Sequence, residues 1–399
     1  MGKELKITTV KYAKAPDRKA ARLLLHKIVE KPASFEPRKV DKQLILYGAA
    51  RLGKLAKDYF DKLGIPFLFV VDANPDRHRK DPFWTGIDIL DINDVPVDMR
   101  ESALFAICVG TESFTKVRAP LIENGWRDIV PFYDISEAYR EFHPLSNGWY
   151  SGSLDKSDIF GIESALYRWE DDISRAHHLQ FIAWRSLREE WFFDDAPVTI
   201  NDRYFIPQVL SVLHDHEVFL DIGSYHGEVI IRFLEIVKNR YKEIFAIEPD
   251  KENLIKLRSR LKKYMSPDKG NIHLLECSLG SEAKKERFYH GLGFASQFSE
   301  LGQTEVEVKC LDDLSVPATF IKLHIEGWED NAISGSLETI RAHRPILTIT
   351  AYHKRNGLWA LPFQVMVCCL DNYAFYFRLH SWHGTGAVIY AIPRERSNC

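Results

Sequence analysis

The sequence predicts an α/β protein with two parallel-sheet units joined by a helical, aromatic-rich segment. Apolar runs of strand length alternate with amphipathic helical stretches over residues 42–150 and again over 206–399. Such alternation is typical of a mainly parallel sheet with helices on both faces. The stretch between them, 151–205, has helical periodicity and many aromatic side chains, which indicates a packing surface between domains. We therefore expect an N-terminal helix and arm (1–41), a smaller α/β domain, a helical linker and a larger α/β domain.

Composition narrows the class of protein. Of the 399 residues, 45% are hydrophobic and 27% are charged, which is the normal balance for a globular chain. The net charge of -3 supplies no basic field for nucleic acid, so we expect no nucleic-acid partner. The six cysteines form no CxxC or zinc-ligand spacing, and we expect a reducing, cytoplasmic location. We see neither a signal peptide nor an apolar run that could span a bilayer, and so expect no membrane partner. The oligomeric state, a homo-oligomer included, is left open.

The smaller unit begins after a basic segment in which we expect a helix at about 17–31. Its stretch "LILYGAARLGKLA" resembles a dinucleotide-binding fingerprint that keeps Gly48 and Gly53, with Asp72 close to the place of the ribose-binding acid. Ala50 stands where the middle glycine would let the backbone approach a phosphate. No set of hydride-transfer residues accompanies the motif. Because Gly48, Gly53 and Asp72 are nevertheless present, the alternative function is a NAD or nucleotide-sugar oxidoreductase built on this half of the chain.

The larger unit alternates strands and helices more regularly. Its predicted strands are 217–222, 243–248, 272–277, 318–325 and 345–351, and its predicted helices lie near 228–239, 251–264, 330–342 and 361–371. "YAFYFRLH" and "GAVIYAIP" follow as strands of a terminal hairpin. In such sheets, ligands bind beyond the carboxyl ends of the strands, so the residues at those ends are the candidates for function.

Two adjacent strand ends indicate the cofactor. In "VFLDIGSYHGE" a strand runs into Asp221, Gly223 and Gly227 before a helix begins. The next strand ends at Glu248, whose carboxylate can accept hydrogen bonds from both hydroxyls of a ribose. An acid in the loop disfavours a pyrophosphate and suits a cationic ligand, which favours S-adenosylmethionine over NAD. The alternative for Glu248 is that it only caps the following helix.

Four stretches, taken in their order along the chain, resemble a known protein family. "VFLDIGSYHGE", "FAIEPDKENLIKL", "LDDL" and "IKLHIEGWEDNAISGSLETI" together resemble the FkbM family of S-adenosylmethionine-dependent methyltransferases over about 204–392. The resemblance implies a Rossmann-like class I methyltransferase domain with a seven-stranded, mainly parallel sheet. It also implies O-methylation of a sugar or another secondary metabolite, so the expected partner is a small-molecule or carbohydrate acceptor.

The resemblance also assigns cofactor-binding residues. It implies that the loop consists of Asp221, Gly223, Ser224 and Gly227, that Glu248 holds the ribose, and that Ser278 and Ser281 lie beside the adenine. The family usually has an acid near Ser281, and this chain lacks it. At 321–327 the family pattern is I-K-x-D-x-E-G, and His324 replaces the aspartate.

The catalytic candidates end neighbouring strands. His324 and Glu326 end the fourth predicted strand and His353 ends the fifth, and with His226 they should converge on one pocket. His324 is the best candidate for the base, because an unperturbed imidazole titrates near neutral pH. Glu326 would orient His324 or bind the substrate. We expect no metal, although a site of three histidines and a glutamate is chemically possible.

Three further expectations concern the surroundings of this pocket. Lys322 shares the strand face of His324 and is expected to form a salt bridge, while Lys354 and Arg355 are candidates to contact an acidic acceptor. The Gly- and Ser-rich stretch 291–301 is either a flexible cover for the acceptor or an inert connection. A non-catalytic protein with a methyltransferase fold is the third reading of the chain.

Overall fold

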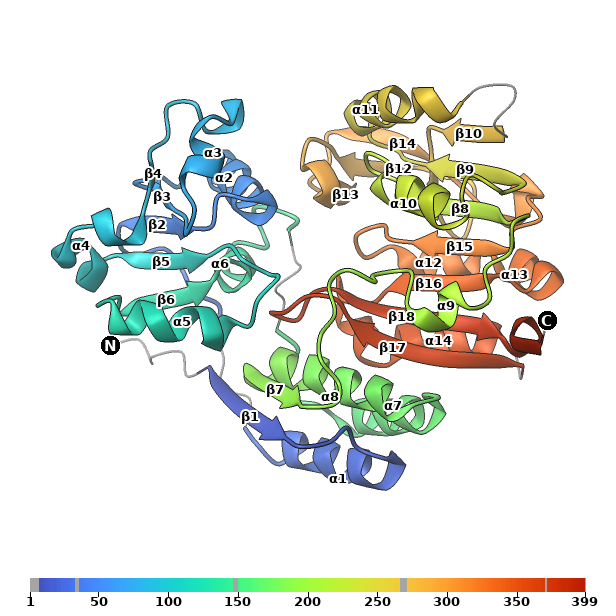
Figure 1. Ribbon diagram of the computed structural model, residues 1–399, viewed down its shortest axis with the longest axis horizontal. Coiled ribbons are helices and arrows are strands. Elements are labelled where there is room, and N and C mark those ends of the chain that lie inside the picture. The colour runs from blue at the N-terminus through green and yellow to red at the C-terminus, as the bar shows by residue number, and fades with distance from the viewer. Residues whose placement is uncertain (1–6, 33–35, 146–149, 266–270, 370–371, 399) are drawn as a thin grey trace.

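A computed structural model describes residues 7–32, 36–145, 150–265, 271–369 and 372–398. Two α/β units stand beside each other, and a layer formed by α1, α7 and α8 lies below them in the view of Figure 1. The predicted α/β class with mainly parallel sheets is confirmed. Parts of the predicted N-terminal arm lie outside the described residues. The domain limits given above stay a prediction.

The smaller unit is a five-stranded parallel sheet in the order β4-β3-β2-β5-β6. Its strands are β2 (Leu44–Tyr47), β3 (Val70–Val71), β4 (Ile89–Leu90), β5 (Leu104–Ile107) and β6 (Asp128–Pro131). Its helices are α2 (Arg51–Leu63), α3 (Asp76–Arg79), α4 (Val97–Ser102), α5 (Phe114–Glu123) and α6 (Phe132–Ala138). β2 and β5, at the centre of this sheet, are almost wholly buried, as expected for a sheet with both faces covered.

The larger unit is a seven-stranded sheet in the order β10-β9-β8-β15-β16-β18-β17, in which β18 runs in the opposite direction to the other six strands. Its strands are β8 (Val218–Ile222), β9 (Glu243–Ile247), β10 (Asn271–Leu275), β15 (Phe320–Leu323), β16 (Ile346–Thr350), β17 (Tyr373–Leu379) and β18 (Ala387–Pro393). The helices that accompany the sheet are α9 (Pro207–Leu210), α10 (Glu228–Ile236), α11 (Lys251–Leu261), α12 (Glu329–Ser334), α13 (Leu337–His343) and α14 (Ala360–Cys368). The predicted terminal hairpin is present as β17 and β18.

The helix predicted at 330–342 is wrong as a single element, because α12 and α13 are separate. Gly335 lies between them, and a Cβ added there would stand 2.0 Å from the carbonyl oxygen of Gly280. The backbone therefore passes this point closely, at a position that only glycine allows. The close approach brings α12 and α13 against Gly280, the residue that follows β11 (Ser278–Leu279).

The predicted helical linker also needs correction. It contains α7 (Lys156–Arg168) and α8 (Asp172–Leu187), followed by a strand, β7 (Glu189–Phe193), that pairs in parallel with β1 (Thr8–Tyr12). Asp171 starts α8 by accepting a hydrogen bond from the backbone N–H of Ser174. Arg188, at φ +55°, ends α8 and turns the chain into the strand. The predicted N-terminal helix is present as α1 (Arg18–Val29), which packs against α7 and α8.

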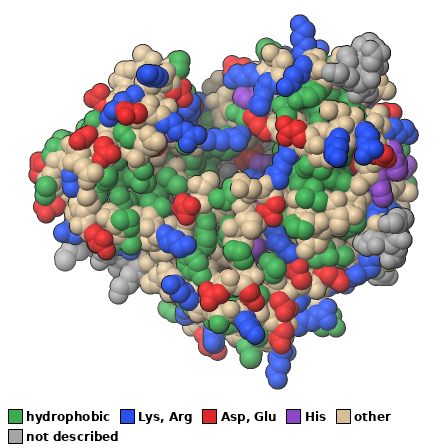
Figure 2. Space-filling model, viewed as in Figure 1, with side chains coloured by type: hydrophobic (Ala, Val, Ile, Leu, Met, Phe, Trp, Pro, Cys, Tyr) green, Lys and Arg blue, Asp and Glu red, His purple; other side chains and the backbone are tan. Residues whose placement is uncertain are grey.

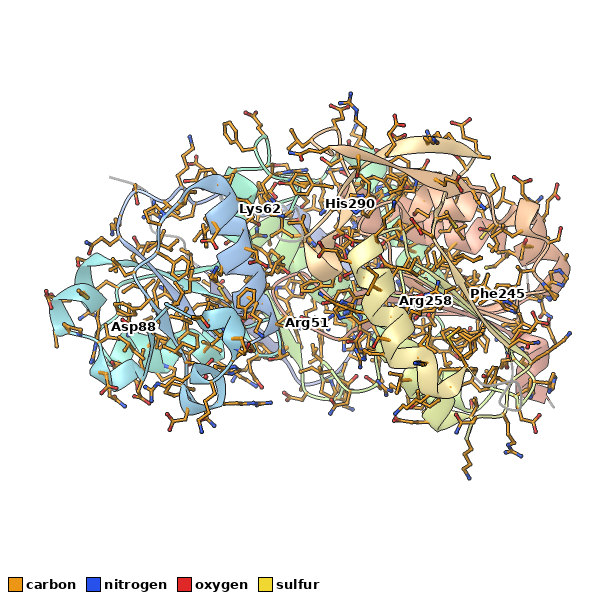
Figure 3. The ribbon with its side chains drawn as sticks, turned by 90° about the horizontal axis from the view of Figure 1, so that it is seen from above. Arg51, Lys62, Asp88, Phe245, Arg258 and His290 are labelled. Atoms are coloured by element: carbon orange, nitrogen blue, oxygen red, sulfur yellow. The ribbon has the colours of Figure 1, made fainter. Side chains whose placement is uncertain are left out.

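A four-stranded sheet extends the larger unit towards the smaller one. Its order is β11-β14-β12-β13, with β11 (Ser278–Leu279), β12 (Lys284–Tyr289), β13 (Gln297–Phe298) and β14 (Thr304–Lys309). Between β12 and β13 the chain carries Leu292 and Ala295 into the same buried apolar cluster as Leu55 and Tyr59 of α2. Seen from above, α2 with Arg51 and Lys62 faces the His290 segment and α11 (Figure 3). Among the described residues, no helix is long and apolar enough to cross a membrane.

Candidate active site

A cavity of about 370 Å³ opens at the carboxyl ends of β8, β9 and β15. Most of its lining comes from the larger unit, and Arg51 comes from the smaller one. The space-filling view is hollowed between the two units, with basic side chains gathered beside the hollow (Figure 2). This size is within the range of small-molecule and cofactor sites. The cavity lies where parallel sheets place their ligands.

The loop after β8 borders the cavity and depends on glycine. Gly223 has φ +77°, and an added Cβ would lie 1.9 Å from the carbonyl oxygen of His324. Gly227 has φ +81° and precedes α10, where an added Cβ would lie 2.8 Å from a methyl group of Leu257. The hydroxyl of Ser224 donates to the carbonyl oxygen of Asp221 at 2.6 Å and closes the turn. Of these residues, Gly223 and Ser224 line the cavity.

Asp221 lies beneath the cavity and does not line it. Its side chain is fully buried, and its Oδ1 lies 2.7 Å from Nζ of Lys322. Lys322 also donates to the carbonyl oxygen of Gly223 at 2.6 Å. The salt bridge expected for Lys322 is present. The argument that a loop acid selects a cationic ligand is wrong for Asp221, because Lys322 neutralises it and the loop covers it.

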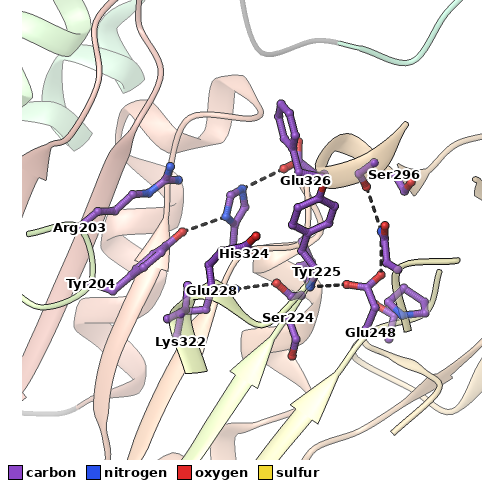
Figure 4. Close-up of a pocket in the computed structure, with 18 of the residues that line it drawn as sticks. Arg203, Tyr204, Ser224, Tyr225, Glu228, Glu248, Ser296, Lys322, His324 and Glu326 are labelled. Carbon is purple, nitrogen blue, oxygen red and sulfur yellow. Dashed lines mark hydrogen bonds and ion pairs between the residues drawn. The ribbon is translucent and has the colours of Figure 1, made fainter. Parts of the chain in front are cut away.

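Glu248 is buried at the end of β9 and faces the cavity. Its Oε2 accepts a hydrogen bond from the backbone N–H of Tyr225 at 2.7 Å (Figure 4). Its Oε1 accepts one from the backbone N–H of Asp250 at 3.0 Å. Burial raises the pKa of the Glu248 carboxyl to about 7, although these hydrogen bonds oppose the rise. The capping alternative is wrong, because Asp250 is the residue that caps α11.

The two serines assigned to the adenine lie in different places. Ser278, in β11, is buried and lines the cavity. Ser281 is exposed in the turn beyond β11 and lies outside the cavity lining. The placement of Ser281 beside an adenine in this cavity is therefore wrong. Only Leu279 and Gly280 lie between Ser278 and Ser281, and the carbonyl oxygen of Gly280 packs against Gly335.

The stretch 291–301 is a fixed wall of the cavity. Asp250 Oδ2 accepts hydrogen bonds from the Ser296 hydroxyl at 2.9 Å and from the Gly291 N–H at 3.3 Å. Asn253 donates from its side chain to the carbonyl oxygen of Gly293 at 3.0 Å. Four residues of this stretch, Gly293, Phe294, Ser296 and Phe298, line the cavity, so the stretch is more than an inert connection, and its role as a flexible cover for the acceptor stays a prediction. Here it is held by polar contacts with α11 and by apolar packing on the smaller unit.

His324, Glu326 and His353 form one cluster at the carboxyl ends of β15 and β16. Nε2 of His324 lies 2.9 Å from Oε1 of Glu326, and Nε2 of His353 lies 3.4 Å from the same oxygen. The predicted convergence is correct for these three residues. His324 and Glu326 line the cavity, while His353 is buried behind them. His226 does not join them: its ring stacks on that of Tyr225, with the centroids 3.6 Å apart, and it is not part of the cavity lining.

Both nitrogens of His324 already have partners. The Tyr204 hydroxyl lies 2.9 Å from Nδ1, and the Tyr352 hydroxyl lies 3.1 Å from Nε2, the nitrogen that also faces Glu326. Burial lowers the pKa of His324 to about 3, although Glu326 opposes the change. An imidazole in this setting stays neutral and has a hydroxyl or carboxylate group beside each nitrogen, which weakens the prediction that it acts alone as the base.

Charge is concentrated around His353. Its Nδ1 donates to Oε1 of Glu329 at 2.8 Å. Burial lowers the pKa of His353, but the charges of Glu326 and Glu329 raise it well above its usual value. For Glu326, burial acts in the opposite direction and would raise the pKa of the carboxyl, but the neighbouring His353 and His324 hold this pKa below its usual range. The cluster therefore balances two buried carboxylates against shared positive charge.

Several residues of the site were missed from the sequence. Arg203 and Tyr204 precede α9 and line the cavity beside His324, and Arg232 lines it from α10. Arg51 reaches it from the smaller unit and lies over the Phe294 ring at 4.7 Å. Arg203, Tyr204 and Arg232 stand in no recognisable motif, and Arg51 stands in the dinucleotide-like stretch of the smaller unit, which does not predict a contact with this cavity. Only the tertiary arrangement brings them to the cavity.

The residues suggested for an acidic acceptor lie elsewhere. Arg355 makes a hydrogen bond of 2.9 Å to Asp158 in α7, away from the cavity lining. Lys354 lies over the ring of Trp328 at 5.5 Å and is likewise not part of the lining. Both side chains are therefore engaged in contacts within the protein.

In the smaller unit, contacts within the protein occupy the polar groups and glycines of the dinucleotide-like motif. Asp72 Oδ2 accepts a hydrogen bond of 2.7 Å from the backbone N–H of Ala49. The indole N–H of Trp84 donates to the carbonyl oxygen of the same residue at 3.1 Å. Gly53 packs so close to Gly48 that an added Cβ would lie 1.9 Å from its carbonyl oxygen. The glycines and the acid are explained by this internal packing.

Comparison with known proteins shows what the larger unit is similar to. Residues 221–375 match the family model of the methyltransferase FkbM domain, which confirms the resemblance predicted from the sequence. The crystal structure of methyltransferase FkbM from Methylobacillus flagellatus KT is similar at 19% identity and a TM-score of 0.62. The similarity covers 94% of this chain and 100% of that one. The two proteins thus share a fold along nearly the whole chain, the smaller unit included.

Other similar structures cover less of the chain. A putative methyltransferase from Streptococcus mutans in complex with SAH is 12% identical, with a TM-score of 0.29, over 46% of this chain and 92% of that one. An SAM dependent methyltransferase from Aquifex aeolicus is 11% identical, with a TM-score of 0.28, over 48% and 89%. No curated protein matches the chain.

Proposed function

We propose that this chain, whose residues 221–375 form a methyltransferase FkbM domain, transfers the methyl group of S-adenosylmethionine to a hydroxyl of a small acidic acceptor. One observation carries the proposal. The glycine loop after β8, the carboxylate of Glu248 after β9 and the His324 cluster after β15 face a single cavity. The first two fit a cofactor, and the third lies where an acceptor would meet it.

The residues on the cofactor side fit S-adenosylmethionine. Gly223 brings bare backbone to the cavity, as a closely bound ligand requires. Glu248 has its carboxylate fixed by two backbone N–H groups and keeps lone pairs for two ribose hydroxyls. When bound, S-adenosylmethionine supplies an electrophilic methyl group on a sulfonium. The loop and Glu248 would hold the ligand in one orientation, and Phe294 and Ser296 would exclude water from one side.

The residues on the acceptor side fit an anionic molecule. Arg51, Arg203 and Arg232 line the cavity, and none of the three forms an ion pair within the described part of the chain. Arg203 donates to the Tyr352 hydroxyl at 3.1 Å, which leaves most of its guanidinium donors for a ligand. Arginine recognises carboxylates and phosphates through paired donors. The acceptor would therefore carry such a group near the hydroxyl that is methylated.

Calorimetric titration with S-adenosylmethionine, S-adenosylhomocysteine, NAD and a nucleotide-sugar tests the cofactor assignment. We expect the first two ligands to bind once per chain, and Glu248→Ala to weaken both by about 1–3 kcal/mol, the cost of an unpaired polar group. Binding of NAD or the nucleotide-sugar alone would support the alternative oxidoreductase. Failure of folded protein to bind the first two ligands would remove the proposal.

Transfer of a labelled methyl group to a panel of small hydroxyl compounds tests the acceptor class. Each acidic compound is paired with its neutral analogue, such as a sugar acid with the parent sugar. We expect turnover with acidic members of the panel and a KM at least tenfold higher for Arg51→Ala, with unchanged affinity for S-adenosylhomocysteine. Equal turnover of acidic and neutral analogues would show that the arginines do not select an anionic acceptor, and would leave the cofactor assignment intact.

A further inference from the structure

The His324, Glu326 and His353 cluster has the spacing of a metal-ligand set. Each residue offers one donor atom, and the three atoms lie within 4.8 Å of one another. Nε2 of His324 and Nε2 of His353 lie 2.9 Å and 3.4 Å from Oε1 of Glu326. Ligands about 2.0–2.2 Å from one ion stand roughly 3–3.5 Å apart, so the two measured distances match edges of a coordination shell.

The backbone is shaped to bring Glu326 into this set. Glu326 has φ +51°, in the left-handed region that residues other than glycine rarely adopt. Gly327 follows at φ +96°, and its N–H donates to Oε2 of Glu329 at 2.9 Å. The resulting turn sends the Glu326 side chain back towards His324 (Figure 4). Conformations of this kind persist where the surrounding structure enforces them, often at functional sites.

Outer contacts orient both imidazoles. Nδ1 of His353 donates to Glu329, which also accepts from the Thr350 hydroxyl at 2.8 Å. Nδ1 of His324 contacts the Tyr204 hydroxyl at 2.9 Å. Each ring therefore uses Nδ1 for orientation and turns Nε2 towards Glu326. A histidine whose second nitrogen is held by a carboxylate in this way is characteristic of metal sites.

Three donors around one point need a positive centre between them. A neutral His353 with Nδ1 as its donor would aim a lone pair at a carboxylate oxygen. A proton relieves that repulsion along one line of contact, whereas a metal ion relieves it for all three donors together. A dication would also balance the two buried carboxylates, Glu326 and Glu329, while both imidazoles stay neutral, the form that binds metals.

We propose that His324, Glu326 and His353 bind one divalent first-row transition-metal ion, of the class that takes two imidazoles and a carboxylate. Zn²⁺ and Fe²⁺ accept such a ligand set and keep further positions open. His324 and Glu326 border the cavity, so the open positions would face it. This role builds on the proposed function, because the ligand expected at those positions is the acceptor hydroxyl.

The ion would activate that hydroxyl without a separate strong base. A hydroxyl oxygen bound to a dication has a lowered pKa and releases its proton to solvent in the open cavity. The new bond forms between this oxygen and the methyl carbon while the bond from carbon to sulfur breaks. The electron pair of the broken bond stays on sulfur, which becomes a neutral thioether. The Tyr352 hydroxyl, 3.1 Å from Nε2 of His324, stands beside the same position.

The test is a titration of untagged, chelator-treated full-length protein with Zn²⁺ and, in parallel, with Co²⁺. We expect one ion per chain and weak visible Co²⁺ bands without the intense thiolate absorption that a cysteine site would give. Glu326→Gln and His353→Gln should each weaken Zn²⁺ binding more than tenfold. His273→Gln, on β10 at the far edge of the sheet, is the matched control and should bind like the parent protein.

S-adenosylhomocysteine titration of every variant separates this inference from the proposed function and reports on folding. If the parent protein binds S-adenosylhomocysteine but less than 0.2 equivalents of Zn²⁺ (roughly one fifth occupancy), the cluster is a proton-bridged network and the metal proposal is wrong. Unchanged Zn²⁺ affinity in a folded Glu326→Gln or His353→Gln variant would also overturn it. Zn²⁺ binding without S-adenosylhomocysteine binding would support the ion and remove the methyltransferase assignment.

Discussion

Lys322 and Asp221 form a buried ion pair directly beneath the glycine loop, with Nζ and Oδ1 2.7 Å apart and side-chain exposures of 2% and 0%. Lys322 also donates to the carbonyl oxygen of Gly223, the residue that borders the cavity. The pair therefore links the stability of two central strands, β8 and β15, to the position of the loop. A change at Lys322 should be visible both in unfolding and in ligand binding.

Lys322→Met is expected to lower the free energy of unfolding by about 3–5 kcal/mol, because it leaves the Asp221 carboxylate buried without its charge partner. Urea denaturation followed by circular dichroism measures the change. The double variant Asp221→Asn with Lys322→Met should recover part of the loss, since it removes the stranded charge. A loss below about 1 kcal/mol in the single variant would show that the pair contributes little.

Glu248 should make cofactor affinity depend on pH. Burial raises its folded-state pKa to about 7, so the carboxyl is largely protonated at pH 6 and largely ionised at pH 8. The ionised form accepts hydrogen bonds from ribose hydroxyls more strongly. The dissociation constant for S-adenosylhomocysteine should therefore fall as pH rises from 6 to 8, which calorimetry at several pH values measures.

Glu248→Gln is the matched control for that titration. It keeps the shape of the side chain and removes the ionisation, so the dependence on pH should flatten while affinity drops to the level of the protonated parent protein. Asp250 is a neighbouring acid. Burial acts to raise its pKa, but hydrogen bonds from the Ser296 hydroxyl and from backbone N–H groups, that of Gly291 included, hold this pKa below its usual value. A slope that survives in Glu248→Gln would assign the dependence to the ligand or to another group.

The strand ends of the larger unit could be predicted because apolar runs of strand length, alternating with helical stretches, mark the buried strands of a parallel sheet. That pattern placed Glu248, His324 and His353 at the edge where the cavity opens. It could not report that Asp221 is covered, because Lys322 lies far along the chain and the two meet only when β8 and β15 pair. Ser281 was misplaced because adjacency in a motif does not decide which residues face a cavity: Ser278 lines it, whereas Ser281 is exposed in the turn after β11.

The contribution of the smaller unit could not be predicted for a different reason. Its glycine motif read as a ligand site, but Trp84 and Asp72 use the backbone polar groups of Ala49, which a linear pattern does not contain. Arg51 reaches the cavity only because Leu292 and Ala295 pack against α2. Contacts between the two units join side chains that are far apart in the sequence, and a single sequence does not show which of these side chains meet.

Asp250→Asn is expected to loosen the wall formed by residues 291–296. Asn remains a good helix cap, so α11 should keep its stability. The charge that accepts hydrogen bonds from the Ser296 hydroxyl and the Gly291 N–H is lost. Hydrogen exchange should therefore speed up at 291–296 with little change in α11. Ser296→Ala removes one of the two contacts and should give a smaller effect; equal exchange in all three proteins would show that apolar packing alone holds the wall.

Gly223→Ala should abolish cofactor binding, because a Cβ at this position meets backbone that cannot move aside. The added atom would lie 1.9 Å from the carbonyl oxygen of His324, and φ +77° is strained for any other residue. Relief requires β8 and β15 to separate at the point where the metal-ligand candidates begin. We expect loss of S-adenosylhomocysteine binding by calorimetry together with a lower melting temperature.

Gly64→Ala is the matched control, since it carries the same positive-φ strain in open space, and should lower stability while leaving binding intact. If Gly223→Ala bound the ligand as well as Gly64→Ala, the loop would not be the cofactor cradle.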